Sequence, residues 1–69
     1  SKEELKRKLD ELKKRSDTLK ELSKKLKEIS ERNPDDKSVH RTIIRIHREF
    51  VKNHKEIVRV IEEIVSDKS

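Results

Sequence analysis

The chain has 69 residues, of which 51% are charged and 28% are hydrophobic, and its formal net charge is +5 at pH 7. This length predicts one small domain, near the size at which a single hydrophobic core is marginal. The lack of cysteine excludes disulfides and thiolate metal sites, and no apolar run reaches the length of a membrane span.

The distribution of charge argues against specific binding of nucleic acid. Acidic and basic residues are interleaved along the whole chain, and Phe50 is the only aromatic residue. Proteins that bind nucleic-acid strands usually combine a basic stripe with aromatic rings that stack on bases. We therefore expect only nonspecific attraction to polyanions. No signal peptide is visible at Ser1, so we expect a soluble protein, and its localisation stays open.

Apolar residues at seven-residue spacing predict a first helix over residues 3–32. The column that sets its register, heptad position a, contains Leu5, Leu12, Leu19 and Leu26. The rest of the surface is rich in acid-before-base pairs four residues apart, such as Glu4/Lys8 and Glu11/Arg15. Each such pair stabilises a helix by about 0.2 to 0.5 kcal/mol, and their regularity indicates a solvated outer face.

Residues 33–35 predict a tight loop between two helices. A residue before proline is disfavoured in the helical region, so Asn33 should end the first helix, in a left-handed cap before Pro34. Asp35 is the expected N-cap of a second helix over residues 36–66, with Asp36 in its first turn. A loop this short places the helices antiparallel, and residues 66–69 are expected to form a polar tail.

The second helix has an unusually wide face of apolar and histidine residues. Its heptad columns are a (His40, His47, His54, Ile61), d (Ile43, Phe50, Ile57, Ile64), e (Ile44, Val51, Val58, Val65) and g (Val39, Ile46, Asn53, Val60). Four such columns form a face that is wider than the seam of a two-stranded coiled coil. The sequence therefore predicts an all-α antiparallel hairpin that assembles into a multi-helix coiled-coil bundle.

An isolated hairpin would leave much of this wide face in water, which monomers rarely tolerate. We therefore expect the second helices of several chains to pack together, with the first helices outside. The expected oligomer core consists of Ile43, Ile44, Ile46, Phe50, Val51, Ile57, Val58, Ile61, Ile64 and Val65.

A serine column in the first helix predicts partners for the histidines. Heptad position e of that helix contains Leu9, Ser16, Ser23 and Ser30. If facing residues have numbers that sum to 70, the predicted pairs are Ser30/His40, Ser23/His47, Ser16/His54 and Leu9/Ile61. A serine hydroxyl can bond one nitrogen of a neutral imidazole, and the other nitrogen then needs a group from a neighbouring chain. Thr42 and Asn53 are further candidate members of this network.

The histidines have three candidate roles. The first is structural, because buried polar layers fix helix register and oligomeric state. The second is a pH switch, because burial disfavours the charged imidazolium and acid would then dissociate the assembly. The third is a metal site between chains, since successive histidines of one helix lie about 10.5 Å apart along its axis. The matched serines favour hydrogen bonding over metal binding, so no metal is predicted.

Enzymatic activity and a cofactor are not expected. The chain has no glycine for a phosphate-binding loop and no His-Glu-x-x-His sequence. A facing serine and histidine can act as nucleophile and base, but these columns contain no third, acidic residue to orient the histidine.

The whole chain resembles de novo designed helical-hairpin oligomers with buried hydrogen-bond networks. The resemblance is carried by the charge-paired helices, the Asn33-Pro34-Asp35-Asp36 loop and the repeated serine and histidine layers. It is strongest to designed pH-responsive homotrimers, and it implies an expressed synthetic chain that forms a six-helix bundle of three copies. A dimer of copies stays open, as does a designed heterodimer in which a cognate helical hairpin completes a four-helix bundle.

Overall fold

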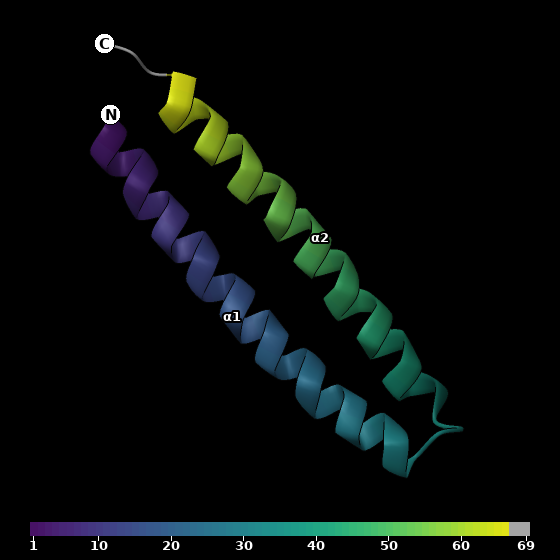
Figure 1. Ribbon diagram of the computed structural model, residues 1–69. Helices are drawn as coiled ribbons and strands as arrows, with labels where there is room; N and C mark the ends of the chain where they lie inside the picture. Colours follow the sequence, from purple (N-terminus) through teal and green to yellow (C-terminus); the bar gives the residue numbers. More distant parts are fainter. Residues whose placement is uncertain (67–69) are drawn as a thin grey trace.

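A computed structural model describes residues 1–66, which form two helices, α1 (Lys2–Arg32) and α2 (Lys37–Ser66). Figure 1 shows the helices side by side and antiparallel, joined by one short loop. The all-α antiparallel hairpin predicted from the sequence is confirmed. The predicted starts of the two helices each differ from the observed start by one residue. The predicted polar tail lies outside the described residues except for Ser66.

Both ends of α1 are capped by side chains. The backbone N–H of Glu4 donates to the Ser1 hydroxyl at 3.3 Å, which makes Ser1 the N-cap. At the other end, the side-chain amide of Asn33 donates to the Ile29 carbonyl at 3.1 Å. The prediction of a left-handed Asn33 is wrong, because its φ is −133° and its ψ is 64°. Pro34 keeps the preceding residue out of the helical region, and the Asn33 side-chain amide takes over part of the capping.

The loop is a turn in which the Asp36 backbone N–H donates to the Asn33 carbonyl at 3.1 Å. Pro34 and Asp35 are its two central residues, so Asp36, and not Asp35 as predicted, becomes the N-cap of α2. The Asp36 carboxylate accepts from the Ser38 hydroxyl at 2.7 Å and from the Ser38 backbone N–H at 2.9 Å. The Ser38 hydroxyl is the main cause that lowers the pKa of Asp36. The cap thus satisfies N–H groups that the first turn leaves without a helical partner.

The core of the hairpin is a narrow strip between the two helices. Its most buried side chains are Leu19, Asn53 and Val60, which are 7%, 6% and 1% exposed. Other residues of the strip are half-buried, including Leu5, Leu12 and Leu26 of α1. Neither helix contains, within residues 1–66, a segment long and apolar enough to span a membrane.

Candidate assembly interface

The side of α2 that faces α1 is a coiled-coil seam formed by columns d and g. Its residues follow one another at alternating spacings of three and four: Ile43, Ile46, Phe50, Asn53, Ile57, Val60 and Ile64. All seven are buried or half-buried in the single chain. Alternating spacings of this kind place side chains along one line of a helix, where a second helix packs. We call this set the inner seam.

A second line with the same spacings runs beside the inner seam, one residue further along the chain. It consists of Ile44, His47, Val51, His54, Val58, Ile61 and Val65. The apolar members keep large exposed fractions, for example 52% for Ile44, 41% for Val58 and 72% for Val65. We call this set the open seam, because α1 does not cover it. The expected oligomer core is thus divided between a seam that the chain buries itself and a seam that it leaves exposed.

The histidine column lies on the exposed side of α2. His40, His47 and His54 are all exposed in the single chain, as is Ser23, while Ser16 and Ser30 are half-buried. Within residues 1–66 no hydrogen bond joins a histidine to a serine. Burial of the histidines in an assembly stays a prediction.

One predicted pair does lie in a common groove. Ser23 of α1 and His47 of α2 both line a hollow of about 730 Å³ on the open side of the hairpin. The other lining residues are Lys20, Lys24, Ile43, Ile44, Ile46 and Phe50. The groove therefore extends from the α1 lysines to the first turns of the open seam, and its floor is mainly apolar.

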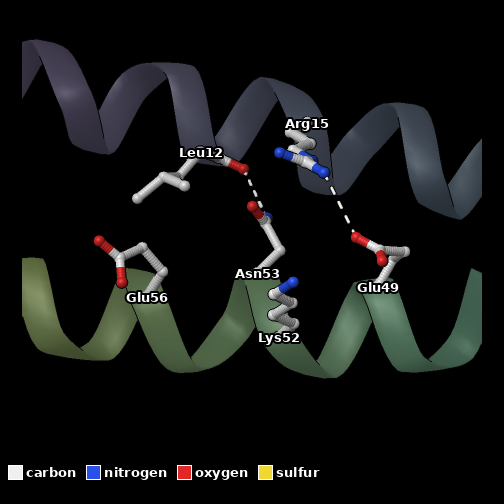
Figure 2. Close-up of a pocket in the computed structure, with 6 residues that line it drawn as sticks. All are labelled: Leu12, Arg15, Glu49, Lys52, Asn53 and Glu56. Atoms are coloured by element: carbon white, nitrogen blue, oxygen red, sulfur yellow. Dashed lines mark hydrogen bonds and ion pairs between the residues drawn. The ribbon is translucent and has the colours of Figure 1, made fainter.

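The side-chain hydrogen bond to the backbone across the hairpin comes from another column of α2. Asn53, at position g, donates from its side-chain amide to the Leu12 carbonyl at 2.9 Å, as Figure 2 shows. Column g therefore faces α1, in agreement with the burial of columns d and g. Because successive residues of a helix differ in direction by about 100°, the histidine column a points away from this contact.

The two additional candidates for the network behave differently. The Thr42 hydroxyl donates to the Ser38 carbonyl of its own helix at 2.9 Å, so its donor is used locally. Asn53 is deeply buried, and its Oδ1 has no hydrogen-bond partner. Asn53 is therefore the polar residue of the inner seam.

On one edge of the hairpin, which we call the closed flank, ion pairs connect the helices. Lys8 lies 3.2 Å from Glu56, and Arg15 lies 3.4 Å from Glu49. Figure 2 shows Arg15 and Glu49 reaching toward each other beside Asn53. The sequence pattern had assigned Lys8 and Arg15 to acids of their own helix, Glu4 and Glu11. Sequence spacing identifies neighbours within a helix but not the acids that a second helix brings nearby.

The carboxylate of Glu56 is the most strongly perturbed group at the closed flank. Hydrogen bonds from Arg59 and then from Lys8 lower the pKa of Glu56 to about 2. Arg59 also lies 2.9 Å from Glu63. Only the contact from Lys8 joins the two helices, and because these side chains are largely exposed, each contact contributes little to stability.

Within the described residues, no three histidine, cysteine or acidic side chains are grouped as they would be around a metal ion. Comparisons with protein-family models, with curated proteins and with solved structures give no match for this chain.

Proposed function

We propose that the protein is a structural assembly module in which helices of other chains bury the open seam. The observation that carries this proposal is the second row of three-and-four spacing on α2, which repeats the geometry of the inner seam but has no helix packed on it. Burial of apolar surface contributes about 25 cal/mol per Å². Covering Ile44, Val51, Val58, Ile61 and Val65 would therefore add substantially to the small core of the hairpin.

The first candidate assembly is a homotrimer. Three hairpins would place their α2 helices around a common axis and their α1 helices outside, giving a six-helix bundle. His47 and His54 would then alternate with Ile44, Val51 and Val58 along the packed line. Polar layers between apolar layers penalise shifted registers, so they would select one assembly among several apolar alternatives.

Acid sensitivity is part of this proposal. A buried imidazole is tolerated when it is neutral and hydrogen-bonded, whereas a buried imidazolium carries a desolvation cost. Assembly would accordingly be favoured at neutral pH and opposed when acid protonates His47 and His54. Three copies bring several histidines into each bundle, so dissociation would be cooperative.

The test is the mass of the purified chain by light scattering at about pH 7.5 and about pH 4.5. If the homotrimer is the assembly, a mass of three times the chain mass of 8.3 kDa is expected, and only at the higher pH. The matched variant replaces His40, His47 and His54 by glutamine, which keeps hydrogen-bonding capacity and cannot be protonated. It should remain assembled at both pH values. Equal acid dissociation of the variant would assign the pH response to other groups.

A second candidate is a heteromeric bundle, in which a cognate hairpin packs on the open seam. One observation favours it: most of the residues that border the open seam are basic on both helices, with Glu62 as an exception on α2. In this case the purified chain alone would be monomeric or would aggregate at neutral pH, and mixing with the partner would produce a defined complex.

A further inference from the structure

The two edges of the hairpin differ in their charge pattern. At the closed flank, cations of α1 meet carboxylates of α2, as in the pairs Lys8/Glu56 and Arg15/Glu49. At the opposite edge, which we call the open flank, both helices contribute cations. The α1 column is Lys6, Lys13, Lys20 and Lys27, and the α2 column is Arg41, Arg48 and Lys55, followed by Glu62 near the end of the helix. The hairpin therefore neutralises one edge internally and leaves the other edge positive.

These cations directly border the open seam. On α2, Arg41 and Arg48 lie one turn before and one turn after Ile44, because residues three and four apart are neighbours on a helix. On the other side, Lys20 and Lys24 form the α1 wall of the groove that contains His47. An apolar strip with cations along both borders is the surface that an arriving helix would meet.

Few carboxylates of the chain compensate this charge. Lys6 lies 3.7 Å from Glu3 and Lys24 lies 3.6 Å from Glu21. No ion pair within residues 1–66 involves Lys13, Lys20, Lys27, Arg41, Arg48 or Lys55. The next column outward on α1 contains Asp10, Asp17 and Glu31, but beside Lys20 it contains Lys24. The lining of the groove thus contains two lysines, Lys20 and Lys24, and no carboxylate.

This pattern disfavours a second copy of the chain as the occupant. In a symmetric bundle with α2 inside, the α1 lysine column of one chain lies next to the arginine column on α2 of its neighbour. Like charges brought together at an interface oppose association and slow it, most strongly at low salt. An occupant with carboxylates along both edges would instead reproduce the matched pairs of the closed flank.

We propose that the open seam binds an amphipathic helix from a different chain, with aspartate or glutamate along both edges of its apolar face. The inference rests on the proposed function, because it requires that the open seam is buried by a helix, and it specifies the chemistry of that helix. Apolar side chains spaced at three and four residues fill the groove beside Ile44 and Phe50. Polar groups of the partner lie opposite His47 and His54 and bond the imidazoles. Its carboxylates pair with Lys20 on one edge and with Arg48 on the other.

Charge reversal in the protein itself gives the first test. The double variant Lys20→Glu/Lys27→Glu places acidic residues on the α1 edge. In a symmetric assembly of copies, these acids would lie next to Arg41 and Arg48 of a neighbouring chain. The matched control is Arg7→Glu with Lys14→Glu, on the side of α1 that faces away from α2. Both double variants lower the formal net charge by four, from +5 to +1. Mass is measured by light scattering at about 50 mM and about 500 mM NaCl, since salt screens these charges.

The proposal expects the unmodified chain and the control to remain near 8.3 kDa at low salt. The Lys20→Glu/Lys27→Glu variant should form a larger species that high salt weakens. A homotrimer of the unmodified chain that is equally stable at both salt concentrations would overturn the acidic-partner inference while leaving assembly as the function. Equal association of the two double variants would also overturn it, because net charge alone would then explain the result.

The second test uses synthetic helical peptides as probes. One probe has four heptads with isoleucine and leucine on its apolar face and glutamate along both edges, and the matched probe has lysine at the same edge positions. A scrambled probe keeps the glutamate composition without an apolar face. We expect the glutamate helix to bind at least about tenfold more tightly than the lysine helix at low salt. The scrambled probe should not bind.

Each alternative result has a distinct meaning. Equal binding of the scrambled and ordered glutamate probes would identify a general attraction to polyanions and refute a helical partner. Equal binding of the glutamate and lysine helices would keep the open seam as an interface but refute the inference that the partner helix has acidic edges. If no probe binds and none of the chains associates, the proposed assembly function fails together with the inference.

Discussion

The side-chain amide of Asn53 donates a 2.9 Å hydrogen bond to the backbone carbonyl of Leu12, across the interface between the two helices. Asn53 is only 6% exposed, and its Oδ1 has no partner. The other residues of the inner seam are apolar. A buried polar residue in an apolar seam lowers stability but penalises shifted registers, because a shift would leave both of its polar atoms without partners.

Replacing Asn53 by leucine should therefore stabilise the hairpin and loosen its register. The substitution removes a buried oxygen without a partner, and such an atom costs about 1 to 3 kcal/mol. Urea denaturation at a fixed protein concentration measures the expected rise in the free energy of unfolding. As a comparison, Asn53→Asp buries a negative charge at the same place and should lower it. A loss of stability in Asn53→Leu would mean that the hydrogen bond to Leu12 outweighs the unpaired oxygen.

Two valines of α2 that lie in different seams should distinguish folding from assembly. Val60 is 1% exposed in the inner seam, whereas Val58 is 41% exposed in the open seam. Val60→Asp buries an unpaired charge and should cost about 3 kcal/mol or more, seen as loss of the helical circular-dichroism signal. Val58→Asp should keep the helical signal but abolish binding of the glutamate helix that covers the open seam. Equal loss of helix in both variants would contradict the division into two seams.

The capping carboxylate of Asp36 should give the hairpin a pH-dependent component of stability. The Ser38 hydroxyl and backbone N–H groups lower the pKa of Asp36 below 3.8. A lowered folded-state pKa means that the stabilisation is present above the ordinary value and is lost as the pH falls through the folded value. Asp36→Ala should lower the thermal midpoint at neutral pH, and Asp36→Asn should retain the cap without this pH dependence. Asp35→Ala is the control and should leave the midpoint nearly unchanged.

The carboxylate of Glu56 should titrate at about 2, which NMR of its side-chain carboxyl carbon can measure. Arg59 is the larger cause of this lowered pKa and Lys8 the smaller. Arg59→Gln should therefore raise the pKa of Glu56 more than Lys8→Gln does. The contribution of Glu56 to stability is present above the ordinary value of 4.5 and is lost as the pH falls toward 2. A reversed order of the two variants would show that the contact between helices dominates.

Much of the fold was accessible from the sequence, because each feature depends on local physics. Seven-residue spacing of apolar residues predicts the two helices, and Pro34 predicts the break between them. The short loop then leaves only an antiparallel arrangement. The width of the apolar face of α2 also indicated that one neighbouring helix is too few. The choice of Asp36 over Asp35 as the cap depended on which residues the turn occupied.

The sequence by itself determined which residues are helical, that α2 has more apolar surface than α1 can cover, and that the histidines share one column. Only the tertiary structure decided which part of that wide face α1 occupies. Helical periodicity defines an apolar face but not where a single neighbour packs within it, and a shift of one residue turns the contact by about 100°. The packing of α1 on columns d and g places Asn53 in the inner seam, leaves His47 in the open groove and brings Lys8 to Glu56.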